Sequence, residues 1–98
     1  MHYIATFQHS PEHCWAREEN ASKARSVIPE LEHRAESHGV TLHGAYAAPN
    51  EHTLFLIVES DSFAAVSRFL GSPILEDHEG EITPVLTMDE TMDAVIEG

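Results

Sequence analysis

The chain has 98 residues, which is the length of a single domain (residues 1–98) with a modest core. Seventeen acidic residues against five basic ones give a formal net charge of −12, so we expect neither nucleic acid nor an anionic membrane as a partner. The longest apolar run, residues 54–58, is only strand-sized, and the chain does not begin with the basic segment of a signal peptide. One cysteine, Cys14, cannot form an internal disulfide. We therefore expect a soluble, cytoplasmic protein.

The first third of the chain is expected to form a strand followed by helices. Residues 2–9 are rich in β-branched and aromatic side chains, which favours a strand. Ser10 and Pro11 are typical of a helix N-cap and first helical position. Apolar residues spaced by three and four predict a helix over residues 21–35, and Pro29 should kink or divide it.

The middle of the chain is expected to form two strands. Gly39 is a C-cap for the preceding helix, and residues 40–48 follow as a second strand. Residues 49–51 form a tight connection to a third strand, residues 52–60. This third strand is the most apolar segment, so it should lie inside the sheet.

The last third is expected to add a helix, a strand and a tail helix. Residues 61–62 cap a short helix over residues 63–70, which Gly71 and Pro73 end. Residues 74–81 are expected to form a loop before a fourth strand, residues 82–87. Thr87 and Glu90 then form a capping box for a C-terminal helix. The apolar stripe of this helix consists of Met88, Met92, Val95 and Ile96. We expect its two methionines to serve in packing.

This order of elements predicts an α+β fold of the ferredoxin-like βαββαβ type. Its antiparallel four-stranded sheet has the order 4-1-3-2, with helices on one face, and a C-terminal helix follows. Both faces of the strands carry apolar side chains, so helices on one face would leave the other face wet. We therefore expect a homodimer that covers it. The apolar strand residues are Ile4, Phe7, Leu54, Phe55, Leu56 and Ile57.

The segment GVTLHGAYAAPNEHTLFLIVESDSFAAVSRFL, with HSPEHC ahead of it, resembles small, mostly uncharacterised ferredoxin-like proteins of bacteria and archaea. Their wider relatives are dimeric α/β barrels, among them antibiotic-biosynthesis-type monooxygenases, chlorite-dismutase-like haem proteins and stress-responsive barrel proteins. The resemblance implies a dimeric α/β barrel. It implies no particular set of catalytic residues, since this fold supports many chemistries.

Three segments of this topology are expected to bring histidines to one end of the sheet. Strand 1 runs antiparallel between strands 3 and 4, so its C-terminal end adjoins the starts of both. The residues at these three places are His9, Glu12, His13 and Cys14, then Glu51 and His52, then Asp77, His78 and Glu79.

Such a cluster predicts a transition-metal site. Imidazole and thiolate are ligands for zinc, copper, iron or nickel. We expect His9, His52 and His78 to bind the ion, helped by His13 or Cys14, with nearby carboxylates orienting the imidazoles. The role of the ion, whether redox, sensory or storage, stays open at this point. Solvated, unrelated histidines remain the alternative.

Other chemistries stay open. Cys14 at a helix start beside His13 or His9 has the features of a nucleophile. A second alternative is a metal-free monooxygenase-like enzyme, in which a small-molecule or flavin pocket contains His43 and Tyr46 beside Tyr3 and Phe55. A third is a non-catalytic structural or interaction dimer. The remaining histidines, His2, His33 and His38, are expected on the surface.

Overall fold

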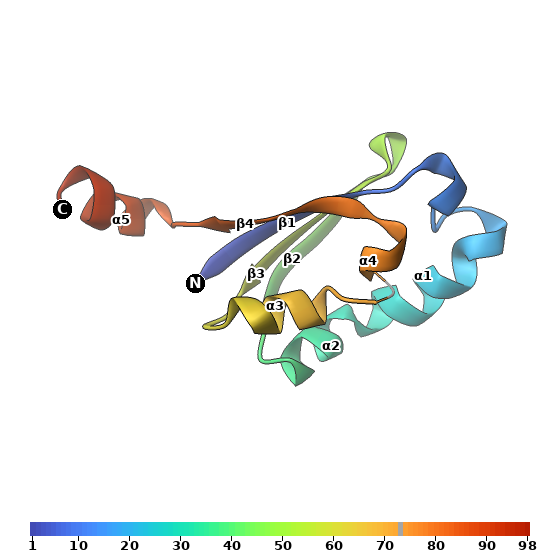
Figure 1. The fold of residues 1–98 in the computed structure, drawn as a ribbon, viewed down its shortest axis with the longest axis horizontal. Helices are drawn as coiled ribbons and strands as arrows, with labels where there is room; N and C mark the ends of the chain where they lie inside the picture. Colours follow the sequence, from blue (N-terminus) through green and yellow to red (C-terminus); the bar gives the residue numbers. More distant parts are fainter. Residues whose placement is uncertain (73) are drawn as a thin grey trace.

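A four-stranded antiparallel sheet forms the frame of the protein (Figure 1). The computed structural model describes residues 1–72 and 74–98. The sheet has the order β2-β3-β1-β4, which is 4-1-3-2 when it is counted from the other edge. β1 therefore lies between β3 and β4 and is antiparallel to both, as the sequence predicts. The strands are β1 (His2–Gln8), β2 (Thr41–Ala48), β3 (Thr53–Glu59) and β4 (Glu79–Val85).

The helices α1 to α4 lie on one face of this sheet (Figure 1). A 3-10 turn, Ile28–Glu30, separates the first two helices where the predicted helix contains Pro29. This turn confirms the predicted division of the helix. Its cause is that proline has no backbone N–H and cannot continue the α-helical hydrogen bonds. The helices are α1 (Ala21–Val27), α2 (Leu31–Ser37), α3 (Phe63–Phe69) and α4 (Ile74–Asp77).

The hydrophobic core lies between the helices and the inner face of the sheet. Along β1, Tyr3, Ala5 and Phe7 are buried, and the residues between them are more exposed. This alternation follows from the two-residue period of a strand. The core also contains Trp15, Val27, Ala35, Val40, Leu56, Val58, Ala65, Val66, Phe69, Leu70 and Ile74.

Local signals in the sequence fix several ends of elements. The Ser62 hydroxyl accepts a hydrogen bond from the amide of Ala65 at 3.1 Å, which caps α3. Thr87 and Glu90 form the predicted capping box at the start of α5 (Met88–Thr91). Gly39, after α2, has a φ of 74°, a left-handed conformation that glycine adopts without strain.

Two elements differ from the sequence prediction. Pro11 opens only a 3-10 turn, Pro11–His13, and the Ser10 side chain does not cap it. The segment expected as a loop contains α4, and β4 begins at Glu79. The loop prediction was wrong because Ile74, which is 2% exposed, is buried in the core, and because Glu79 pairs with Gln8 of β1. Pro73, expected to end the preceding helix, lies outside the described residues.

The C-terminal tail extends beyond the end of the sheet (Figure 1). After α5 the chain makes a π-helical turn, Met92–Ile96. The apolar residues of this tail remain exposed, with Met88 of α5 at 77% and Val95 of the turn at 68%. The predicted apolar stripe of the C-terminal helix therefore does not pack against the core. No helix within residues 1–72 and 74–98 has the length and apolarity needed to cross a membrane.

A candidate metal centre at one end of the sheet

His9 and His52 lie side by side where β1 ends and β3 begins. The amide of His9 donates a hydrogen bond to the carbonyl of His52 at 3.1 Å, which extends the pairing one step past Gln8 and Thr53. The two rings meet edge to face with centroids 5.3 Å apart. His52 has a φ of 53° and a ψ of 41°, a left-handed conformation that few residues other than glycine adopt. Such strain is often stored at functional sites.

His78 joins this pair from the connection between α4 and β4. Its side chain is buried, with 6% of the residue exposed, and its ring centroid lies 4.9 Å from that of His9. Its Nδ1 is 2.7 Å from the carbonyl oxygen of Ile74. A carbonyl only accepts hydrogen bonds, so Nδ1 carries a proton, and in the neutral ring the lone pair is on Nε2. This is the orientation that second-shell hydrogen bonds give to a metal-binding histidine.

Four buried ring nitrogens of the cluster lack a hydrogen-bond partner within the part of the chain that the structure describes. They are both nitrogens of His9, Nδ1 of His52 and Nε2 of His78. A buried polar atom without a partner typically costs about 1–3 kcal/mol. Most buried polar atoms in proteins are satisfied, so a ligand or an ordered water is the expected partner of these nitrogens.

Cys14, and not His78, forms the closest ligand set with His9 and His52. One ligand atom each from His9, Cys14 and His52 lie within 4.8 Å of one another, and all three residues are half-buried. Ligand atoms of a tetrahedral zinc site lie roughly 3.3–3.8 Å apart, as bond lengths of about 2.0–2.3 Å require. Small side-chain rotations would therefore bring the three atoms to coordination distance.

The electrostatics of the cluster favour neutral imidazole. Burial lowers the pKa of His9 below its ordinary value of 6.5, and the neighbouring His78 and His52 lower this pKa further. Asp77 opposes them in part by raising it. A neutral ring has the free lone pair that a metal requires, so His9 is ready to bind near neutral pH.

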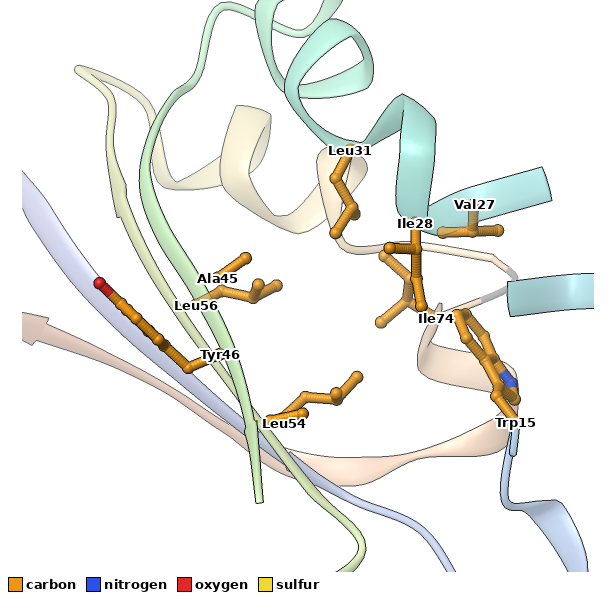
Figure 2. Close-up of a pocket in the computed structure, with 10 residues that line it drawn as sticks. Trp15, Val27, Ile28, Leu31, Ala45, Tyr46, Leu54, Leu56 and Ile74 are labelled. Carbon is orange, nitrogen blue, oxygen red and sulfur yellow. The ribbon is translucent and has the colours of Figure 1, made fainter. Parts of the chain in front are cut away.

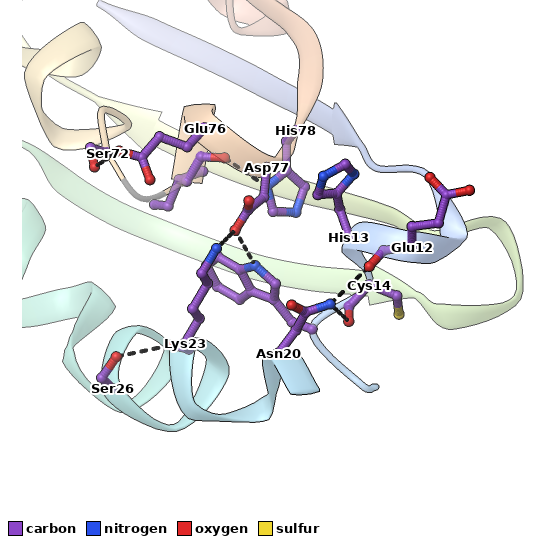
Figure 3. A network of polar contacts seen from close by, with 12 residues as sticks. Glu12, His13, Cys14, Asn20, Lys23, Ser26, Ser72, Glu76, Asp77 and His78 are labelled. Carbon is purple, nitrogen blue, oxygen red and sulfur yellow. Dashed lines mark hydrogen bonds and ion pairs between the residues drawn. The ribbon is translucent and has the colours of Figure 1, made fainter. Parts of the chain in front are cut away.

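Asp77 lies beside the cluster and forms hydrogen bonds with its neighbours (Figure 3). Its Oδ2 accepts hydrogen bonds from Trp15 Nε1 at 2.9 Å and from Lys23 Nζ at 2.8 Å. These two bonds, the Lys23 bond first, lower the pKa of Asp77. Asp77 therefore positions Trp15, whose ring meets the His78 ring edge to face with centroids 5.2 Å apart. The His78 imidazole itself is oriented by the backbone carbonyl of Ile74 and not by a carboxylate.

His13 stays outside the cluster. It is exposed, and its Nδ1 lies 2.8 Å from the Ser10 hydroxyl. It does line a polar cavity of about 430 Å³, together with His9 and His78. This cavity gives the cluster a polar approach that an ion can use.

The residues of the expected small-molecule pocket are divided between the two faces of the sheet. Tyr3 is buried under the helices. On the opposite, open face Tyr46 is 64% exposed and pairs with Phe55. His43 lies 2.8 Å from a carboxylate oxygen of Glu59 there, after a β-bulge between Leu42 and Gly44. His43 and Glu59 also form a second potential ligand group with His2, which the sequence analysis did not anticipate.

The fold and this cluster define a small α+β protein with three histidines and a cysteine at one end of its sheet. The whole chain, residues 1–98, matches the family described as "Domain of unknown function (DUF3303)", and it belongs to that family. It is also similar to the crystal structure of SCO4226 from Streptomyces coelicolor A3(2), at 18% sequence identity and a TM-score of 0.56. That likeness covers 89% of this chain and 98% of the other. No curated protein matches the sequence.

Proposed function

We propose that this protein binds one transition-metal ion through His9, His52 and His78, with Cys14 as a fourth ligand. The observation that carries the proposal is the group of buried ring nitrogens that have no hydrogen-bond partner among the described residues. A bound cation would satisfy one lone pair on each of the three rings, whereas the N–H of His9 would still need an acceptor. His13 is left out of the ligand set because its ring nitrogen bonds Ser10.

The donor atoms favour zinc, nickel, copper or iron over magnesium and calcium. Imidazole and thiolate are intermediate to soft ligands, whereas magnesium and calcium prefer oxygen. Asp77, a carboxylate buried near the cluster, already bonds Trp15 and Lys23. Cys14 is half-buried at the edge of the cluster. If it left the ion, three histidines would remain, with one open position for an incoming molecule. A sensory or redox role follows more naturally from such a site than a structural one.

Calorimetric titration of zinc, nickel and copper into tag-free protein tests this proposal. We expect one ion per chain, and replacing His9, His52 or His78 by alanine should each reduce affinity by at least about 10–100-fold. His33→Ala and His38→Ala, on and after α2, are matched controls and should bind as wild type. Equal, weak losses across all five variants would show a diffuse histidine-rich surface and would overturn the proposal.

We further infer that two copies associate through the open face of the sheet, in the ferredoxin-like, dimeric-barrel manner. Ile4 of β1 pairs with Ile57 of β3 on that face, and Ile4 remains 37% exposed. Tyr46 and Phe55 continue the apolar surface toward β2. A second copy would bury this surface, and the exposed apolar residues of α5 could pack against it. Cytoplasmic location is part of the same proposal, because the single cysteine is compatible with a reducing compartment.

The metal-free monooxygenase remains the alternative, favoured by His43, Tyr46 and Phe55 sharing the face that a dimer would enclose. It predicts that chelators leave turnover of an aromatic or quinone-like substrate unchanged. It also predicts a larger loss for His43→Ala than for His9→Ala. The metal proposal predicts the opposite order.

A further inference from the structure

An apolar groove runs between α1 and the β2–β3 edge of the sheet. One cavity of about 150 Å³ lies under Val27 and Leu31, and a second of about 250 Å³ continues from it. Figure 2 shows the side chains on both walls of the first cavity, while Tyr46 points away from it. The two cavities share Trp15, Ile28, Ala47 and Leu54.

The second cavity ends at the histidine cluster. Its lining includes His9, Cys14, His52 and His78 beside the shared apolar residues. The unpartnered nitrogens of His9, His52 and His78 thus lie at one end of a surface that is otherwise apolar. A pocket with an apolar body and a few convergent polar groups at one end is typical of small-molecule sites.

We propose that this groove binds a small molecule with one apolar ring and a single metal-donor head, such as an imidazole, a phenol or a thiol. The head would coordinate the ion in the position that Cys14 gives up, and the ring would lie between Ile28 and Leu54. This inference rests on the proposed metal site. It adds the class of molecule that the site recognises.

The size and charge of the groove select this class. A cavity of about 150 Å³ can hold benzene, so a groove of 250 Å³ accommodates one substituted ring. The charged Asp77 and Lys23 bond each other behind Trp15, so they do not offer a partner for a charged tail. Polyanions are also disfavoured by the net charge of −12.

Binding of 4-phenylimidazole and of imidazole to the zinc-loaded protein, measured by calorimetry at pH 8, tests the inference. Both probes carry the same donor, and only the first carries a ring. Burying a phenyl ring should make 4-phenylimidazole bind about 20-fold more tightly than imidazole. Without zinc, both probes should bind much more weakly.

Ala47→Leu provides the decisive variant. Ala47 lines both cavities and is exposed, so leucine there fills the groove without disturbing the core. We expect the advantage of the phenyl ring to fall to about twofold or less, with zinc and imidazole affinities unchanged. Ala64→Leu, at an exposed position on α3, is the matched control and should keep the wild-type ratio.

The outcomes separate the two proposals. If zinc binds and the two probes have equal affinity, the groove does not select a ring and the inference fails, while the metal proposal stands. A ring preference that survives Ala47→Leu would place the ring elsewhere and also overturn the inference. If none of zinc, nickel and copper binds, both proposals fail.

Discussion

The amide of His9 donates to the carbonyl of His52 across 3.1 Å, and the two imidazoles meet edge to face. This single backbone bond joins the end of β1 to the residue before β3. It places two side chains that are 43 positions apart in sequence beside each other at one end of the sheet. The left-handed backbone of His52 is part of the same arrangement.

Replacing His52 by glycine should separate stability from metal binding. Glycine relieves a left-handed conformation that costs a non-glycine residue about 1–2 kcal/mol, partly offset by greater freedom of the unfolded chain. We expect metal-free His52→Gly to be as stable as wild type or up to about 1 kcal/mol more stable in urea, yet to lose most of its zinc affinity.

Asn50→Gly, in the same turn but outside the cluster, is the control. It should leave zinc affinity unchanged. A His52→Gly protein that is strongly destabilised would show that the imidazole supports the fold, which would contradict a role in ligand binding alone.

The stability of the metal-free protein should fall as the pH falls below about 6.5. The pKa of His9 is lowered in the folded state, chiefly by burial and then by His78 and His52. The unfolded chain therefore takes up a proton first as the pH drops, and the free energy of unfolding decreases until the folded state is protonated too. Above pH 7.5 this group should contribute no pH dependence.

Urea unfolding between pH 5 and 8 in the presence of a chelator measures this effect. His9→Gln should flatten the dependence, whereas His33→Gln, at an exposed position on α2, should not. A slope that is unchanged in His9→Gln would assign the pH dependence to other groups.

Asp77→Ala should destabilise the fold by about 2 kcal/mol. It removes a carboxylate that accepts hydrogen bonds from Trp15 and Lys23, and it leaves the buried indole N–H without a partner. Lys23→Met should cost less, about 0.5 kcal/mol, because the lysine side chain is 41% exposed. Urea unfolding followed by Trp15 fluorescence gives both values.

Asp93→Ala, in the exposed tail, serves as the carboxylate control and should be neutral. Equal stability of Asp77→Ala and the control would mean that the bond to Trp15 does not form in solution.

Ile57→Lys should convert a dimer to a monomer. Ile57 lies at the centre of the open face opposite Ile4, and a buried ammonium without a partner would prevent association there. Light scattering at micromolar concentration should give twice the chain mass for wild type and one chain mass for the variant. Leu75→Lys, at an exposed position on α4, should remain dimeric. A monomeric wild type would exclude the barrel.

Local chemistry in the sequence determined most of the backbone. The cap of Ser62, the capping box of Thr87 and Glu90, and the break at Pro29 each depend on residues within four positions, so they can be read without a structure. The two-residue period of the strands and the short connections also predicted the neighbours of β1. Those neighbours were sufficient to bring His9, His52 and His78 to one end of the sheet.

Only the tertiary structure decided how the cluster is built. The bond between Trp15 and Asp77 spans 62 positions, and no local pattern encodes it. The helix before His78 forms because Ile74 enters a core made by distant residues, and burial of this kind overrides weak local preferences. His13, close to His9 in sequence, bonds Ser10 and stays outside, whereas His78 is buried with its Nε2 free. Topology predicted which residues approach one another, but the orientation of each imidazole depends on packing that the sequence specifies only through the complete fold.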